Sequence, residues 1–72
     1  MPSEITIRGE MIRLGQLLKL AGIIDSGSEA KSFLAGERVL VNDRPEARRG
    51  RQLHPGDTVR VGAHDLRLVA ES

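Results

Sequence analysis

The sequence has no cysteine and only one aromatic residue, Phe33, and each shortage excludes a class of structure or site. Without cysteine, the 72-residue chain forms neither a disulfide nor a thiolate zinc site. Its two histidines, His54 and His64, are too few for a mononuclear metal site, which needs several converging ligands. We therefore expect no metal and no cofactor, and a fold that is stabilised only by the packing of helices and strands.

Long apolar runs are missing as well. Charged residues interrupt the N-terminal segment, at Glu4, Arg8, Glu10 and Arg13. Nowhere does the chain approach the roughly 18 apolar residues of a membrane span, so we expect a cytoplasmic protein that has no membrane partner. The sequence also lacks a phosphate-binding glycine motif and any spacing typical of a Ser–His–Asp triad. We therefore expect neither an enzyme nor a protein that binds a small-molecule substrate.

Basic residues are concentrated in one short segment, although the formal net charge is only +1. Residues 44–51 carry a charge of +3, whereas residues 1–43 and residues 52–72 each carry −1. The charged members of the segment are Arg44, Glu46, Arg48, Arg49 and Arg51. A local basic patch on an otherwise neutral chain favours an anionic partner, and an ordinary solvated loop is the alternative.

Apolar periodicity predicts two helices in the first half of the chain. The first begins at about Met11 and ends before Gly22, and its stripe consists of Leu14, Leu17, Leu18 and Ala21. Residues 26–29 have the pattern of a capping box, which predicts a second helix that ends at Gly36 and buries Phe33. A short connection makes the two helices neighbours in an αα-hairpin. Gly15 inside the first helix indicates close packing or the close approach of a ligand.

After Gly36 the apolar period becomes two, which is typical of strands. Strands are expected around residues 39–41, 58–61 and 66–68, and residues 4–8 alternate like an edge strand or an extended lead-in. Asn42 and Asp43 predict a tight turn, and Pro45 restricts the returning strand to an edge. The predicted fold class is α+β, a two-helix hairpin followed by a small antiparallel sheet, in a single domain covering residues 1–72.

The composition also narrows how the chain could bind nucleic acid. Proteins that read single strands commonly stack bases on aromatic side chains, but Phe33 is directed to the core, so such a platform is excluded unless arginine planes replace it. A DNA recognition helix needs side chains that reach base edges, and residues 27–32 offer only the cation Lys31. Recognition of the phosphate backbone and shape of structured RNA remains, with arginines and the head of the second helix, near Gly27 and Ser28, as anion-binding groups.

Several short motifs together resemble a known family. They are Arg13-Leu14, residues 26–31, residues 36–42 and Pro55-Gly56-Asp57. In this combination they resemble the RNA-binding domain first known from ribosomal small-subunit protein four, with its αL motif, over about residues 12–62. The sequence Arg48-Arg49-Gly50-Arg51 further resembles the small stand-alone bacterial members. The resemblance implies a non-enzymatic module that binds structured RNA, either ribosomal or transfer RNA, on or off the ribosome, through one face formed by two helices and an arginine-rich loop.

The resemblance also implies the residues that bind RNA. Transferred position by position, they are Arg13, Gly27, Ser28, Lys31, Asn42, Arg48, Arg49 and Arg51. For Arg13 and Lys31 a solvated helix flank is the alternative, and for Asn42 it is a role in forming the turn. Gly27 stands where many members have arginine, so the arginine loop would have to compensate. We expect a monomer, and the alternative function is a protein-interaction adaptor that docks an acidic partner through the same arginines.

Overall fold

Two short helices and seven strands form the structure, a computed structural model that describes residues 2–71. The helical elements are α1 (Leu14–Leu20), the 3-10 turn η1 (Gly27–Glu29) and α2 (Ala30–Gly36). The strands are β1 (Ser3–Ile7), β2 (Ile12–Arg13), β3 (Val39–Val41), β4 (Arg44–Pro45), β5 (Gln52–Leu53), β6 (Thr58–Val61) and β7 (His64–Ala70).

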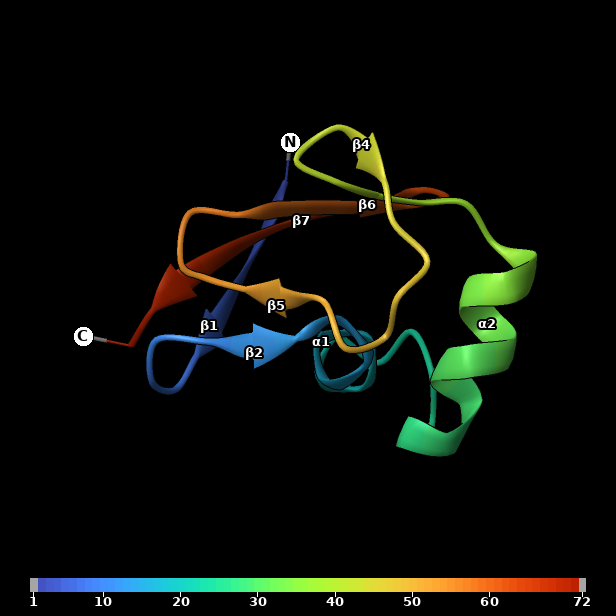
Figure 1. The fold of residues 1–72 in the computed structure, drawn as a ribbon. Coiled ribbons are helices and arrows are strands. Elements are labelled where there is room, and N and C mark those ends of the chain that lie inside the picture. Colours follow the sequence, from blue (N-terminus) through green and yellow to red (C-terminus); the bar gives the residue numbers. More distant parts are fainter. Residues whose placement is uncertain (1, 72) are drawn as a thin grey trace.

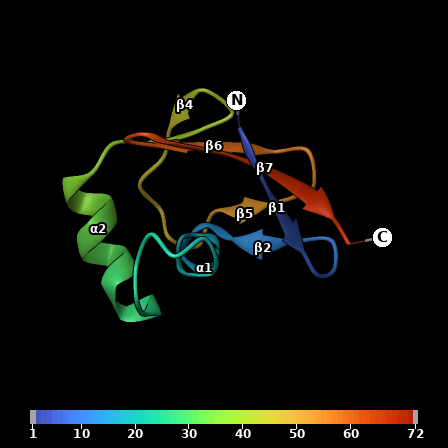
Figure 2. The same ribbon diagram turned by 180° about the vertical axis from the view of Figure 1, so that it is seen from behind.

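The strands form two sheets. One has five strands in the order β1-β7-β6-β3-β4, and the other pairs only β2 with β5. β1 runs parallel to β7, whereas the remaining pairs are antiparallel, so the larger sheet is mixed. Figure 1 shows α1 end-on beside β2 and β5, with α2 at one end of the molecule. The view from behind shows the same arrangement, with β1 beside β7 in the main sheet (Figure 2).

The predicted fold class, a two-helix hairpin followed by a small antiparallel sheet, is wrong. The structure is dominated by strands, each α-helix has only seven residues, and the main sheet is mixed. The extended segment predicted near residues 4–8 becomes β1 and pairs in parallel with the last strand, Ser3 opposite Leu66 and Ile7 opposite Ala70. Local periodicity predicts that a segment is extended but carries no information about which distant segment it pairs with.

Alternation places one face of the main sheet against α1. The buried residues of β3, β6 and β7 come from every second position, and α1 contributes its apolar stripe to the same cluster. These residues are Leu14, Leu17, Leu18, Val39, Val41, Val59, Val61, Leu66 and Leu68. Phe33, predicted to be in the core, is only partly buried and packs against the cluster from its edge. The helix and strand periodicities together were therefore sufficient to identify most of the core.

The β3–β4 turn is confirmed, whereas the capping box is wrong. Asn42 and Asp43 both have positive φ, +51° and +67°, as a tight hairpin turn requires, and β4 with Pro45 is an edge strand. At the start of α2, the amide of Glu29 donates to the backbone carbonyl of Ser26 at 3.1 Å. The Ser26 hydroxyl instead contacts the side chains of Ser28 and Glu29. Because the first turn is a tight 3-10 turn, a backbone carbonyl takes the amide that the serine side chain was expected to cap.

Candidate nucleic-acid interface

Three consecutive carbonyls attach the arginine-rich segment to the head of α1. The Arg49 carbonyl accepts from the Gly15 amide and the Arg51 carbonyl from the Leu14 amide, each at 2.9 Å. Between them, the Gly50 carbonyl accepts from Arg13 Nη1 at 2.9 Å. These bonds use the first amides of α1, which a helix cannot satisfy internally. They hold the loop from Arg49 to Arg51 in one place and thereby set where its side chains project.

Gly15 allows this loop and α2 to approach α1 closely. A Cβ atom at Gly15 would lie 3.2 Å from the Cβ of Ala30 and 3.4 Å from the Cβ of Arg49. The first distance is shorter than ordinary carbon–carbon contact, and the second lies at its lower limit. Of the two roles that the sequence suggested for this glycine, the structure therefore bears out close packing, with three segments meeting at one point.

A hollow of about 360 Å³ lies where α1, η1, α2 and this loop meet, and we call it the helix-side hollow. Its lining consists of Arg13, Gly15, Gln16, Lys19, Gly27, Ala30, Arg49 and Gly50. Arg13 at the end of β2, Lys19 in α1 and Arg49 in the loop supply three cations, and no acidic side chain of residues 2–71 is in the lining. Gln16 Oε1 accepts from the Arg13 amide at 3.0 Å, which fixes the start of the helix. All the charged side chains in the lining of the helix-side hollow are therefore basic.

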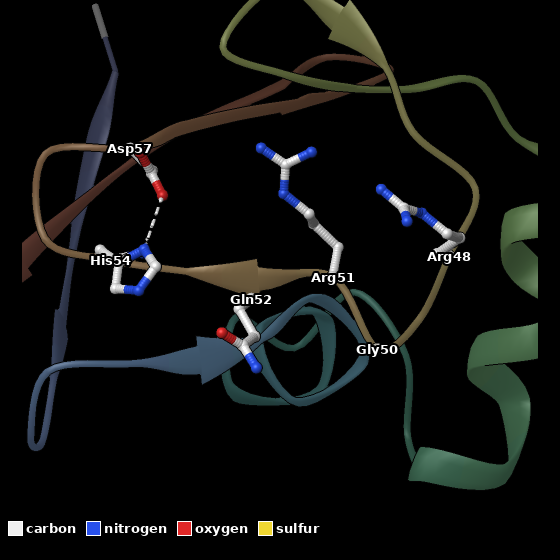
Figure 3. A pocket seen from close by; sticks show the side chains of 6 residues that line it. All are labelled: Arg48, Gly50, Arg51, Gln52, His54 and Asp57. Atoms are coloured by element: carbon white, nitrogen blue, oxygen red, sulfur yellow. Dashed lines mark hydrogen bonds and ion pairs between the residues drawn. The ribbon is translucent and has the colours of Figure 1, made fainter.

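A second hollow, of about 600 Å³, lies on the other side of the loop along β5, and we call it the strand-side hollow. It is lined by Arg48, Gly50, Arg51, Gln52, His54 and Asp57. Figure 3 shows Arg48 and Arg51 at one end of it and the His54–Asp57 pair at the other. Asp57 is held in place, since its Oδ2 accepts from the His54 amide at 2.7 Å and its Oδ1 from Asn42 Nδ2 at 3.1 Å.

Glu46 binds both arginines of the strand-side hollow. Its carboxylate accepts from Arg48 Nε at 3.1 Å, from Arg48 Nη2 at 3.2 Å and from Arg51 Nη1 at 2.9 Å. The backbone amides of Ala47 and Arg48 also donate to it, each at 3.1 Å. The side-chain hydrogen bond from Arg48 is the main cause that lowers the pKa of Glu46 to about 2, against partial desolvation of the carboxylate. Arg48 and Arg51 therefore lie beside a carboxylate that stays ionised, unlike Arg49.

The residues predicted to bind RNA do not all converge. Arg13, Gly27 and Arg49 line the helix-side hollow, whereas Arg48 and Arg51 line the strand-side hollow. Ser28 lines a separate hollow with Phe33 and Glu37, and the exposed Lys31 is in the lining of neither the helix-side nor the strand-side hollow. The Asn42 side chain is engaged in the fold, since its Oδ1 accepts from the Thr58 amide at 3.0 Å. The single face expected from the sequence is thus divided by the loop.

Three residues of this region were not predicted from the sequence. Lys19 and Gln16 were not among the residues expected to bind RNA, yet both line the helix-side hollow. Their spacing contained the signal, because Arg13, Gln16 and Lys19 follow one another at intervals of three residues, and residues three apart are neighbours on a helix surface. Glu46 was counted only as one opposing charge, and no local pattern indicates that it contacts two arginines at once.

Comparison with known proteins assigns the family. The family model described as the S4 domain matches residues 5–69. The chain belongs to the S4 domain family. The resemblance noted in the sequence is confirmed, and the match extends beyond the expected residues 12–62 at both ends.

This S4 domain is similar to two small bacterial proteins over most of their length. It is 56% identical over 61 residues to a Bacillus subtilis protein provisionally named ribosome maturation protein RlbA, and the alignment covers 85% of this chain and 86% of that protein. It is 36% identical over 59 residues to an Escherichia coli protein provisionally named RNA-binding protein YbcJ, with 82% and 84% covered. In residues 2–71 of the S4 domain, neither helix is long and apolar enough to cross a membrane.

Proposed function

We propose that this S4 domain binds structured RNA, without catalysing a reaction, through the helix-side hollow. The observation that carries the proposal is the convergence of Arg13, Lys19 and Arg49 on one hollow that has no acidic lining residue within the described chain. Phosphate groups are the anions that such a site fits, since guanidinium groups bind their oxygens in a bidentate manner. A compact cluster of cations also attracts a polyanion over a distance of about a Debye length.

The fixed position of the loop adds to this argument. Arg49 projects from a segment whose carbonyls are bonded to α1, and Arg13 is itself bonded to that segment at Gly50. Side chains held on an ordered backbone lose less conformational entropy on binding than side chains on a mobile loop. The site is thus suited to RNA of defined shape more than to any flexible polyanion.

The names of the relatives narrow the proposed ligand. One relative is provisionally named a ribosome maturation protein and the other an RNA-binding protein. We therefore propose ribosomal RNA as the ligand ahead of transfer RNA. We further propose that the protein binds this RNA as a monomer in the cytoplasm.

A salt titration of RNA binding tests the proposal. The purified domain is mixed with ribosomal RNA fragments, and the dissociation constant is measured by gel shift at several salt concentrations. If the three cations of the helix-side hollow each neutralise one phosphate, the logarithm of the affinity falls against the logarithm of salt with a slope of roughly −2 to −3. Transfer RNA serves as the comparison ligand.

The alternative function is that of a protein-interaction adaptor. The same cations would suit the carboxylates of an acidic protein, and a domain that retains no RNA at low salt would favour that function. Binding to RNA with no dependence on salt would also contradict the proposal, because phosphate contacts always release counterions.

A further inference from the structure

The strand-side hollow differs in charge from the site just proposed. Glu46 accepts hydrogen bonds from Arg48 and Arg51, and Asp57 lies across the hollow from them. Two guanidinium groups are thus matched by two carboxylates. A phosphate bound here would have to compete with Glu46 for both arginines and would meet a second carboxylate. A phosphate subsite is therefore disfavoured in this hollow.

The same contacts leave the flat faces of the guanidinium groups available. Glu46 holds Arg48 through Nε and Nη2, along one edge of the guanidinium plane, while 76% of the Arg48 side chain remains exposed. Stacking uses the face of a guanidinium and leaves its edge bonded, and arginine planes serve as stacking surfaces for RNA bases. His54 and Gln52 line the same hollow and carry the mixed donors and acceptors that base edges require.

Gly50 connects the two hollows. It is in the lining of both, and the loop from Arg48 to Arg51 sends Arg49 to the helix side and its other two arginines to the strand side. The φ angle of Gly50 is not in the left-handed region, and a Cβ there would meet only Arg13 Nη1, at 3.7 Å. Because Gly50 has no side chain, none stands between the two hollows at this position, where an RNA strand bound in the helix-side hollow would continue to the strand-side hollow.

We propose that the strand-side hollow receives an unstacked nucleobase of the RNA whose phosphates occupy the helix-side hollow, with the base stacked on the Arg48 guanidinium. This inference rests on the proposed function. It assigns the two hollows different ligand groups: phosphate where the cations are unopposed, and an uncharged planar base where they are neutralised. It also supplies from arginine the stacking surface that Phe33, the single aromatic residue and partly buried, does not.

The experiment compares two RNAs and a matched pair of variants. The RNAs are a stem with an adenosine loop and the same stem with the loop bases removed, which keeps every phosphate. Arg48→Lys and Arg49→Lys make the same chemical change one residue apart, and each keeps its positive charge while losing the guanidinium plane. Dissociation constants are measured for the wild type and both variants at one salt concentration, after thermal unfolding has shown that both variants are folded.

We expect Arg48→Lys to weaken binding of the intact loop by about 5-fold or more, as loss of one stacked base would, and to change binding of the base-free loop by less than about 2-fold. Arg49→Lys should affect both RNAs alike. His54→Ala, a change in the same hollow away from the Glu46 contacts, should repeat the selective loss. Equal effects of Arg48→Lys on the two RNAs, or none on either, would overturn the inference while leaving the proposed function intact. A wild type that binds neither RNA would overturn both.

Discussion

The helix-side and strand-side hollows draw their arginines from the same short segment, yet they differ in electrostatic character. Arg49 joins Arg13 and Lys19 in the helix-side hollow, whose lining includes no acidic side chain of residues 2–71, whereas Arg48 and Arg51 are bonded to the partly buried carboxylate of Glu46. The arginines of residues 44–51, which carry a net charge of +3, therefore differ in how readily they can bind an anionic ligand. The comparison teaches that a run of arginines indicates an anionic partner only after the partners of each guanidinium are known.

The largest expected effect comes from removing two cations from one hollow or the other. The double variant R13Q/R49Q should weaken RNA binding by about 100-fold at low salt, since each charge-assisted contact contributes about 1.5 kcal/mol or more. It should also reduce the salt slope by about 2. The matched variant R48Q/R51Q removes the same charge but should change the slope by less than about 1. Both are measured by gel shift across a salt series.

Equal changes of slope in the two double variants would remove the distinction between the hollows. Loss of folding is the trivial explanation for weaker binding, and circular dichroism with thermal unfolding controls for it. Because the side chains of Arg48 and Arg51 are 76% and 38% exposed, substitution there leaves the core unchanged.

The junction beneath the helix-side hollow is the second point to test. Gly15→Val should lower the free energy of unfolding by about 2 kcal/mol, because the added atoms overlap Ala30 and the loop at Arg49. In a domain of this size that corresponds to a fall of roughly 10 °C in the melting temperature. Gly27→Val is the control, since a Cβ at Gly27 has no described atom within 4 Å, and it should change stability by less than about 0.5 kcal/mol.

The Gly15→Val variant should also bind RNA more weakly than the wild type, even at a temperature where the variant is fully folded. Displacing the loop moves Arg49 away from Arg13 and Lys19, so the affinity for RNA should fall. Adding R48Q/R51Q to the Gly15→Val protein should not change the salt slope further. A Gly15→Val protein that is as stable as the wild type would show that the three segments are not tightly packed at this glycine.

The sequence predicted features that depend on neighbouring residues better than features that depend on residues far apart in the chain. Local signals performed well: the alternation of Val39, Val41, Val59 and Val61 identified core positions, and Asn42-Asp43 identified the turn. Signals between distant segments were absent. Nothing local to β1 specifies its parallel pairing with β7. Each two-residue strand of the β2–β5 pair is too short to show a period.

The candidate site shows the same division. The basic segment and Arg13 were recognised from the sequence and from its resemblance to the family. The separation of Arg48 and Arg49 into different hollows was not, because it depends on which loop carbonyls bond to Leu14 and Gly15. The charge count along the chain treated Glu46 as a single negative charge. In the structure Glu46 contacts both Arg48 and Arg51, and it therefore determines the electrostatic character of the strand-side hollow.

Glu46 offers a smaller and pH-dependent test. Its pKa is lowered from 4.5 to about 2 in the folded protein, so the ionised carboxylate stabilises the fold above about pH 4.5, and this contribution is lost as the pH falls toward 2. Glu46→Gln should therefore lower stability at pH 7, by about 1 kcal/mol after allowance for the exposure of its partners. The difference from the wild type should shrink between pH 4.5 and pH 2.

Urea unfolding at pH 7, 5 and 3 measures this difference. Glu37→Gln, at an exposed carboxylate that follows α2, serves as the control and should show little change at any pH. If Glu46→Gln were destabilising by the same amount at pH 3 as at pH 7, the ion pairs with Arg48 and Arg51 would not be the source of its contribution.

The smallest effect is expected at Lys31, which the family resemblance placed in the RNA site. The structure leaves Lys31 exposed and outside the lining of both hollows, whereas Lys19 lines the helix-side hollow. Lys31→Gln and Lys19→Gln remove the same charge, so long-range attraction to RNA falls equally in both variants. Only Lys19→Gln also loses a phosphate contact, and it should weaken binding by about 10-fold, against less than about 2-fold for Lys31→Gln. A loss at Lys31 as large as that at Lys19, measured in the same gel-shift series, would extend the interface along α2 and show that its boundary is not the helix-side hollow.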